Sequence, residues 1–453
     1  MKKNEKITGY LPDERPPFLE LLIFALQQIV VMFPATVLVA LITGFHVSTT
    51  IFASGLATLV FIFVTGKKIP LYYGSSFSYI AAIGSIMTAE AFAGLSLNER
   101  ISIAQFGIMM SGFVSIIAGL IVKRSGQKAI DKVLPATVTG SIAMIIGLSL
   151  AGSAIGNAAS IPEGIEKATQ ALATNWAWTI ALITLFSTII YSVYLKGKLS
   201  QLPILFGLLT GYLAALIIGL FTDIPFVAFN TITSSSIVNL PIFTFPKPSW
   251  EAILAIMPIA IATIPESTAH IYQLDIYVNE LASKMKSKKK YDIASKLGIN
   301  LIGDGIGDIV SSSIGGPAGT NYGENISAMA ISKNFSVPVL IAASIITMII
   351  SCFTPLINVV YSIPSAVIGG LSIYLFGVIA AQGITIMINK NVDLFSSKNL
   401  AVIAVILIIG IGGAFSFEGG MIPIFGTKLP ALATAAIVGI LLNLILSIKE
   451  NKK

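Results

Sequence analysis

The stretch PAGTNYGENISAMAISK (residues 317–333) decides how this chain is interpreted. It is too short and too polar to cross a bilayer as an ordinary helix, yet it lies between two strongly apolar segments and carries Glu324 near its middle. Irregular backbone at membrane depth is tolerated only where protein buries it or where it lines a cavity. An ionisable residue at that depth is by default a functional-site hypothesis. The stretch is therefore predicted to form half of a substrate site.

The composition is that of a membrane protein. Of the 453 residues, 55% are hydrophobic and 11% are charged, and the mean hydropathy is +0.89. A soluble domain carries roughly 25% charged residues. We therefore predict a polytopic membrane protein with neither a cleavable signal peptide nor an appended soluble domain. The net charge of +7 gathers in the loops between apolar segments, which indicates membrane topology and not a nucleic-acid partner.

Residues that commonly ligate metals are scarce. The chain has one cysteine, Cys352, inside an apolar run, and two histidines, His46 and His270. A disulfide framework and a cysteine-ligated metal site are therefore excluded, and we expect neither a metal nor another cofactor. The sequence also offers no nucleophile–base constellation, so it predicts a protein that is not an enzyme.

Fourteen segments are predicted to cross the membrane. A bilayer core needs about 20 apolar residues per helix, and twelve segments are full-length candidates. They cover residues 18–44, 49–65, 103–123, 134–155, 176–195, 202–221, 251–273, 293–314, 337–357, 363–388, 400–415 and 429–448. Two further segments, residues 69–87 and 319–332, are hydrophobic but short or interrupted.

The distribution of basic residues supports this number of spans. With fourteen spans, 24 of the 28 Lys and Arg residues fall on the side of both chain ends. Because basic residues mark cytoplasmic loops, both termini, including residues 1–17, are predicted to be cytoplasmic. The densest cluster, KMKSKKKYDIASK at residues 284–296, is predicted to be a solvated cytoplasmic loop, with binding to anionic lipid as the alternative.

The two halves of the chain carry matching motifs in the same order. Each pair is weak alone: FPAT (33–36) with IPES (264–267), YGSSFS (73–78) with YGENIS (322–327), PATVTG (135–140) with PSAVIG (364–369), and Leu202-Pro203 with Leu429-Pro430. Together they pair span n with span n+7, and since seven is odd, the halves must be inverted. Inverted halves with two interrupted segments at corresponding positions indicate a transporter site. We predict an all-α polytopic membrane protein of 7+7 inverted repeats.

Four acidic residues lie well inside predicted spans: Glu266, Asp304, Asp308 and Glu324. A carboxylate at mid-bilayer is unfavourable unless it is paired, solvated or protonated. Glu266 and His270 are spaced i, i+4 and share one helix face; the alternative is a pair that only cross-links helices. Asp304 and Asp308 are interpreted as hydrogen-bond partners for the backbone of the interrupted segments, with direct proton or cation handling as the alternative.

Other groups complete the predicted site. Gly74 and Gly323 let backbone approach a ligand closely, interrupted helices free N–H groups, and Phe77 offers an aromatic face unless it only fills the core. Gln27 and Gln28 add polar groups to the first span, where a simple interhelical hydrogen bond explains them equally well. This set suits a small planar solute with alternating N–H and C=O groups, and it suits an inorganic anion poorly.

At these motifs the chain resembles the nucleobase–ascorbate transporter family, and within it the bacterial uracil permeases. The resemblance extends over nearly the whole chain. Its most specific stretches are QQIVVMF (27–33), YYGSSFSYI (72–80), PESTAH (265–270) and TNYGENISAMAISK (320–333). It implies 7+7 inverted spans with a short antiparallel strand in each of spans 3 and 10, a place in the bacterial cytoplasmic membrane, and a homodimer.

The resemblance also implies two domains. A core domain would hold spans 1–4 (residues 18–123) and 8–11 (residues 251–357). A gate domain would hold spans 5–7 (residues 134–221) and 12–14 (residues 363–448). The core is expected to move against the gate during proton-coupled nucleobase uptake.

The resemblance assigns site residues motif by motif. The substrate glutamate of span 8 falls on Glu266, its nearby histidine on His270 and the glutamate of span 10 on Glu324. The same three residues are implied in proton coupling. The remaining substrate-binding positions are Ala35, Phe77, Tyr322 and Gly323, and the supporting positions are Gln28 and Asp304.

This sequence departs from the family's usual motifs. Gln27-Gln28 stands where Gln-His is usual, Glu266-Ser267 where Glu-His is frequent, and Phe376 where the gate has a tyrosine. The purine branch typically has Gln-Asn near Gly323-Glu324, so YGEN favours a pyrimidine. The main prediction is a proton-coupled uracil symporter, and a xanthine or other purine permease is the alternative. An anion exchanger or channel of a related 7+7 fold is a third hypothesis, which the acidic site disfavours.

Overall fold

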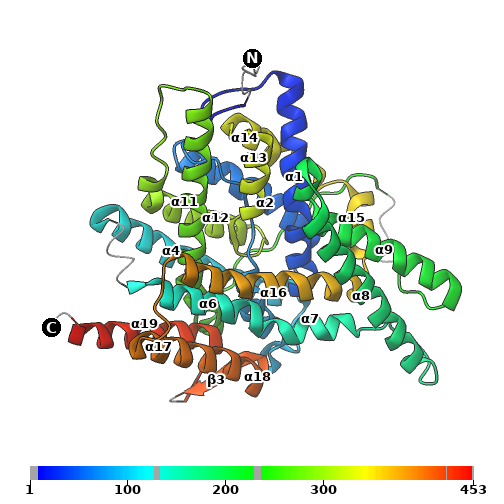
Figure 1. The fold of residues 1–453 in the computed structure, drawn as a ribbon. Coiled ribbons are helices and arrows are strands. Elements are labelled where there is room, and N and C mark those ends of the chain that lie inside the picture. Colours follow the sequence, from blue (N-terminus) through cyan, green and yellow to red (C-terminus); the bar gives the residue numbers. More distant parts are fainter. Residues whose placement is uncertain (1–8, 127–132, 229–235, 425, 451–453) are drawn as a thin grey trace.

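The computed structural model describes residues 9–126, 133–228, 236–424 and 426–450. Parts of three predicted features lie outside these ranges: residues 1–8 of the cytoplasmic N-terminus, residues 127–132 of a basic loop, and the last three residues of the basic C-terminal end. The described chain is mostly helical (Figure 1).

Ten helical segments of the described chain are long and apolar enough to cross a membrane. In three of them the helical hydrogen-bond pattern changes partway along, which divides each of the three into shorter pieces. The segments are α1 (Phe18–Thr43), α2 (Val47–Val64), α4 (Leu97–Ser125), α6 with α7 (Ala136–Ser149, Ala151–Ala158), α8 (Gln170–Tyr194), α9 (Pro203–Thr222), α10 with η4 and α11 (Trp250–Ile256, Met257–Ile259, Ala260–Lys284), α16 (Ser365–Asn389), α17 with η6 and α18 (Ser397–Leu407, Ile408–Gly412, Gly413–Ser416), and α19 (Ala431–Glu450).

Shorter helices occupy the other four predicted spans. They are α3 (Ile80–Thr88), α12 (Leu297–Ser313), α13 (Gly323–Ser332) and α14 (Val337–Ile350). Predicted span 337–357 is wrong in its second half, because the helix ends at Ile350 and α15 (Thr354–Tyr361) follows as a separate helix. The 3-10 turns outside the long segments are η1 (Phe77–Tyr79), η2 (Glu90–Phe92), η3 (Gly197–Gln201), η5 (Ala294–Lys296) and η7 (Glu418–Gly420).

The two interrupted segments meet as a two-stranded antiparallel sheet. Strand β1 (Tyr73–Ser75) pairs with β2 (Gly319–Asn321), with Tyr73 opposite Asn321 and Ser75 opposite Gly319. Both strands are fully buried. The strand in each of the two interrupted spans, which the family resemblance implied, is thus confirmed.

Glycine and tyrosine interlock across this sheet. A Cβ added to Gly74 would lie 2.5 Å from the Tyr322 ring, and one added to Gly319 would lie 2.1 Å from the Tyr73 ring. Neither position therefore has room for a side chain, and each strand presents a glycine to a tyrosine of the other segment.

Polar side chains satisfy the free edges of this sheet. On one edge, Ser54 and Thr58 of α2 each donate to the Tyr73 carbonyl at 2.9 Å, and the Tyr73 amide donates back to Thr58 Oγ1 at 3.0 Å. On the other edge, the Gly319 amide donates to Asp308 of α12 at 2.8 Å. Buried backbone groups at membrane depth need such partners, and α2 and α12 supply them.

Small residues let α4 and α12 approach closely. A Cβ on Gly112 would meet the Gly305 carbonyl at 2.5 Å, and one on Gly119 would meet the Gly298 carbonyl at 2.6 Å. Close backbone approach at small residues is typical of membrane helices. It fixes α12, and with it the aspartates that hold β2.

The matched proline motifs occupy equivalent local positions. Pro135 and Pro364 are the N-caps of α6 and α16, while Pro34 and Pro265 lie inside α1 and α11. In contrast, a second antiparallel pair, β3 (Met421–Ile424) with β4 (Thr427–Pro430), was not predicted. The last predicted span therefore begins too early, because residues 429 and 430 belong to β4 and the helix starts at Ala431.

The N-terminal segment runs beside the connection between α13 and α14. Tyr10 forms a parallel bridge with Asn334. Asp13 pairs with Lys289 and Tyr291 of the predicted basic loop, and these hydrogen bonds hold the pKa of Asp13 below its ordinary value. The Lys289 side chain is more than half exposed, which agrees with a solvated loop.

Large apolar side chains cover the outer faces of the helices. Exposed examples are Phe186 and Ile190 on α8 and Leu220 and Phe221 on α9. A soluble monomer rarely exposes so much contiguous apolar surface. Together with the ten long apolar segments, these faces indicate a multi-pass membrane protein.

Candidate functional site

The candidate site lies where the two strands lead into helices. After β1, Ser76 caps η1, and its hydroxyl accepts a hydrogen bond from the Ser78 amide at 3.3 Å. After β2, Tyr322 caps α13 without a side-chain hydrogen bond. The first amides of a helix have no partner within it and carry the positive end of the helix dipole. Two such helix starts therefore flank the paired strands.

The residues that occupy equivalent positions in the two turns are not those that the sequence alignment of YGSSFS with YGENIS pairs. YGSSFS and YGENIS align Tyr73 with Tyr322, but Tyr73 opens a strand, whereas Tyr322 follows one. Counted from strand to helix, Phe77 corresponds to Gly323 and Ser78 corresponds to Glu324. The predicted alignment is wrong by three residues, because the tyrosines interlock across the sheet and do not occupy the same place in it.

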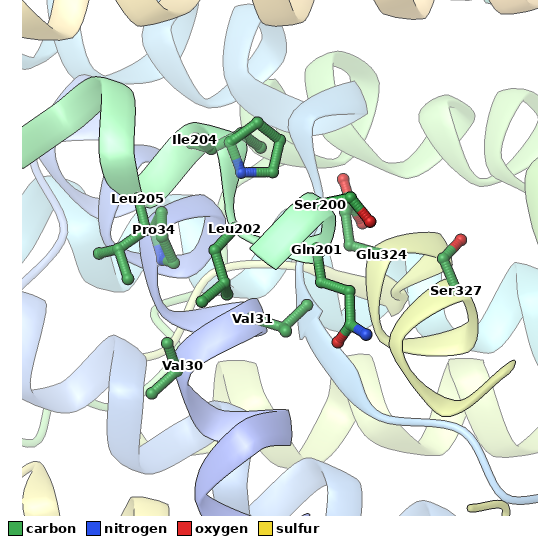
Figure 2. A pocket seen from close by; sticks show the side chains of 11 residues that line it. Val30, Val31, Pro34, Ser200, Gln201, Leu202, Ile204, Leu205, Glu324 and Ser327 are labelled. Atoms are coloured by element: carbon green, nitrogen blue, oxygen red, sulfur yellow. The ribbon is translucent and has the colours of Figure 1, made fainter. Parts of the chain in front are cut away.

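Glu324 faces a cavity. It lies in the first turn of α13, and its side chain is exposed on the wall of a cavity of about 200 Å³. Ser327, one turn further along α13, lines the same cavity. The remaining wall comes from α1 and from the segment of η3 and α9 (Figure 2). A carboxylate at a helix start is stabilised by the helix dipole, which makes this a favourable position for Glu324.

Glu266 lies on α11 across from this helix start. Its carboxylate accepts a hydrogen bond from the Ser78 hydroxyl at 3.4 Å, so the β1 turn holds it from one side. The helix that carries Glu266, α11, contacts α13, which carries Glu324. The two glutamates predicted from the sequence thus lie on neighbouring helices, and of the two only Glu324 lines the cavity.

His270 packs against the start of α13. A Cβ added to Gly323 would lie only 2.9 Å from His270 Nε2. The Nδ1 atom of His270 is buried and has no hydrogen-bond partner among the described residues. The imidazole therefore touches the β2 turn directly and retains an unused polar atom.

Tyr322 and Ala35 are buried, whereas Glu324 is exposed to the cavity. The Tyr322 hydroxyl donates to the Ser75 carbonyl at 2.9 Å and shares a 3.0 Å hydrogen bond with Thr36. Both Tyr322 and Ala35 are almost fully buried. The hydroxyl of Tyr322 thus joins α1 to both turns, and this explains its position without a ligand.

Two aspartates hold the sheet. Asp304 accepts hydrogen bonds from Ser267 at 2.6 Å and from Asn321 at 2.7 Å. Asp308 accepts from the Tyr73 hydroxyl at 2.6 Å as well as from the Gly319 amide. This arrangement agrees with the interpretation that both aspartates support the interrupted segments.

Gln28 of α1 supports the start of α13 through hydrogen bonds from Asn325. It is almost fully buried, and the Asn325 amide donates at 2.9 Å to both its backbone carbonyl and its side-chain oxygen. Asn325 follows Glu324 directly, so Gln28 helps fix the direction of the Glu324 backbone.

Phe77 faces the second half of the helical assembly. Its ring meets the Phe376 ring of α16 edge to face, with centroids 6.2 Å apart and planes at 74°. Edge-to-face contact is a preferred aromatic geometry. Phe77 is only half-buried, which leaves part of its ring surface accessible.

The cavity also contains residues that sequence reasoning missed. Ser200 and Gln201 line it beside Glu324. They lie in η3, a short polar connection that looks like any loop between two apolar segments, so no motif or charge marked them. Among the described residues, no cluster of three or more His, Cys, Asp and Glu side chains is arranged to hold a metal ion.

Comparison with known proteins agrees with the family resemblance. A model described as the Permease family matches residues 19–419. The uracil permease of Bacillus caldolyticus is 36% identical over 96% of this chain and 94% of its own length. Uracil permeases of Bacillus subtilis and Escherichia coli are each 33% identical, over 93% and 96% of this chain and 92% of their own lengths. The matched family and these relatives are permeases, that is, transport proteins.

Solved structures share the fold at low sequence identity. The murine anion transporter Slc26a9 in its inward-facing state superimposes with a TM-score of 0.67 at 13% identity, over 97% of this chain and 69% of the other. The transmembrane domain of the cyanobacterial bicarbonate transporter BicA gives a TM-score of 0.59 at 15% identity, over 95% and 98%. These likenesses establish a transporter-like fold and nothing about the solute.

Proposed function

Because this chain belongs to the nucleobase–ascorbate transporter family, we propose that it is a uracil permease that couples uptake to protons across the bacterial cytoplasmic membrane. The observation that carries the proposal is that Glu324 begins α13 on the wall of a cavity, while Glu266 of the neighbouring helix α11 accepts a hydrogen bond from Ser78 of the other strand-to-helix turn. Relatives named uracil permeases cover almost the whole chain.

The groups around this convergence match the chemistry of uracil. The base is a planar ring with two N–H donors and two carbonyl acceptors. Carboxylates of Glu266 and Glu324 accept the N–H groups, and backbone amides at the helix starts, at Phe77 and Gly323, donate to the carbonyls. The half-buried Phe77 ring supplies a stacking face, and His270 orients the bound edge. Hydrogen bonds to charged groups are the stronger ones, so the carboxylates dominate binding.

The same carboxylates carry the coupled proton. Two like charges close together at membrane depth disfavour each other, and a proton on one of them removes this repulsion. In this proposal uracil binds when one of the two carboxyl groups is protonated and the other is ionised, so a proton must bind to the pair before uracil does. Release of uracil to the cytoplasm then exposes the pair again and lets the proton leave.

Fourteen spans in two inverted halves form the proposed architecture. Ten long apolar segments and the four shorter helices α3, α12, α13 and α14 account for that number. Two observations support the repeat. Pro135 and Pro364 cap equivalent helices, and each strand-to-helix turn is preceded by a strand whose free edge is hydrogen-bonded by one helix, α2 for β1 and α12 for β2.

Movement of a core against a gate completes the proposal. The most extensively packed helix pairs each join helices of one predicted domain: α4 with α12 and α2 with α14 in the core, and α16 with α6 in the gate. Figure 1 shows α16 running beside α6 and α7. Both termini are cytoplasmic in this proposal, and the protein is a homodimer in the bilayer.

Uptake into proteoliposomes tests the function. Purified protein is reconstituted, and labelled uracil uptake is measured with the outside more acidic, with no gradient, and with a protonophore. We expect accumulation only with the gradient and little competition by unlabelled xanthine. Uptake that ignores the gradient overturns proton coupling, and strong competition by xanthine favours the purine permease instead. Protein-free liposomes are the control.

A further inference from the structure

A segment outside every recognised motif lines the cavity beside Glu324. This segment is η3, the 3-10 turn between α8 and α9, and Ser200 and Gln201 of this turn line the cavity wall. Figure 2 shows the Gln201 side chain between Val31 of α1 and Ser327 of α13. A polar side chain of the predicted gate therefore reaches the same space as the substrate glutamate of the predicted core.

The two polar atoms of the Gln201 side chain are used unequally. Its Oε1 accepts a 2.6 Å hydrogen bond from Gln27 on α1, which fixes the plane of the amide. Its Nε2 is buried and has no hydrogen-bond partner among the described residues. A buried donor without a partner is unfavourable, and because Gln201 lines the cavity, a carbonyl group of a solute held there is the nearest source of an acceptor.

The face of α13 that carries Glu324 continues away from the site. Ser327 follows Glu324 by three residues, and Ala330 and Ile331 follow Ser327 by three and four, so all four lie along this face. Ser327 lines both the cavity beside Glu324 and a second cavity of about 430 Å³, whose wall also contains Ala330, Ile331 and Lys333. Because Lys333 lies in a predicted cytoplasmic loop, this face leads from the site towards the cytoplasm.

We propose that Gln201 forms a second subsite for the transported solute, on the cytoplasmic side of the Glu266–Glu324 pair. Gln27 holds the amide by its oxygen, and Nε2 donates to a carbonyl of a small planar ring that has adjacent N–H and C=O groups. The solute occupies this subsite as it leaves Glu324 for the cavity beyond Ser327. The inference rests on the proposed function and on its cytoplasmic orientation.

The subsite predicts an effect that depends on the side of the membrane. Labelled uracil transport is measured in right-side-out and inverted membrane vesicles for Gln201→Met, which keeps the side-chain length and removes the donor. We expect KM from the cytoplasmic face to rise about three- to tenfold, the effect of one lost hydrogen bond, while KM from the outer face changes by less than roughly twofold. The matched control is Gln170→Met at the start of α8, which should leave both KM values unchanged.

A second variant protects the test against misfolding. Gln27→Met leaves Gln201 intact but unoriented, so the same one-sided rise in KM is expected at a smaller size. Equal changes on both faces, or none in either variant, overturn the subsite. Wild-type vesicles that transport no uracil from either face overturn the proposed function and the subsite together, whereas normal wild-type transport with no sided effect removes the subsite alone.

Discussion

The two strand-to-helix turns share a backbone plan and differ in chemistry. Each consists of a buried three-residue strand, one capping residue and a helix start. At corresponding positions, Phe77 matches Gly323, and Ser78 matches Glu324. One turn thus offers a ring and a hydroxyl, while the other offers bare backbone and a carboxylate.

In the proposed mechanism, this difference separates a residue that positions a carboxylate from one that binds the solute. The hydroxyl of Ser78 contacts Glu266, so the first turn holds a carboxylate that belongs to another helix. The second turn carries its own carboxylate into the cavity, and the missing side chain at Gly323 lets His270 approach. The shared backbone plan supplies the scaffold, and the difference at two positions supplies the site.

The largest expected effect comes from Glu324→Gln. This change removes both a charged hydrogen-bond acceptor and a proton carrier, and we expect uracil uptake in proteoliposomes to fall by about 100-fold or more, since a charged hydrogen bond alone contributes ~1.5–3 kcal/mol. The corresponding Ser78→Ala should reduce uptake by only about two- to fivefold. Glu251→Gln, in the first turn of α10, is the matched control. Similar losses in the Glu324 and Ser78 variants would erase the proposed division of roles.

Phe77→Ala is expected to have the next largest effect. Stacking of a base on an aromatic ring contributes ~1–3 kcal/mol, so uracil affinity measured by calorimetry should fall by roughly tenfold or more. Phe376→Ala removes only the edge-to-face partner of Phe77, and its affinity should change less. If Phe376→Ala weakens binding more than Phe77→Ala does, the stacking role of Phe77 is wrong.

Gly323→Ala tests why the second turn lacks a side chain. The new Cβ would lie 2.9 Å from His270 Nε2, and because this atom is at the far end of its side chain, the imidazole can move aside at little cost to stability. We expect uracil affinity to fall about tenfold with little loss of thermal stability, because His270 can shift into the site. Gly84→Ala on α3, where an added Cβ meets no atom within 4 Å, is the control. Unchanged binding by Gly323→Ala would show that the close approach of His270 is dispensable.

The interlocked tyrosines should respond alike and weakly. Tyr73→Phe loses a hydrogen bond to Asp308, and Tyr322→Phe loses one to Ser75. Each change should lower the free energy of unfolding by about 1 kcal/mol, as for a typical buried hydrogen bond. Thermal melts of both variants in the same detergent provide the measurement. A marked loss of uracil binding in Tyr322→Phe, with stability intact, would instead restore a direct substrate role for its hydroxyl.

Much of this organisation could be predicted from sequence. Interruption of the apolar pattern located both turns, and the rule against unpaired charges at membrane depth pointed to four carboxylates, among which the family resemblance selected Glu266 and Glu324. The register of the turns could not be predicted, because identical YG letters suggested a correspondence that the interlocked rings contradict. Gln201 could not be predicted either, since its importance depends on a contact with α1 that is 174 residues distant in the chain.

The extended secondary structure shows the same limit. The pair β3 and β4 precedes α19 in a stretch whose apolar letters resemble the start of a span. A short apolar strand and the end of a buried helix have the same composition, so periodicity alone does not separate them. At the two interrupted spans, by contrast, glycine and polar residues interrupt the apolar run, and this made the interruption of the helix predictable from the sequence.

The central claim is that the Glu266–Glu324 pair binds uracil together with a proton. The most direct measurement uses proteoliposomes loaded with a pH-sensitive dye, to which uracil is added outside in the absence of other gradients. We predict acidification of the lumen that accompanies uracil uptake in the wild type and is absent in Glu324→Gln. Uracil uptake at the wild-type rate without any acidification would contradict this claim.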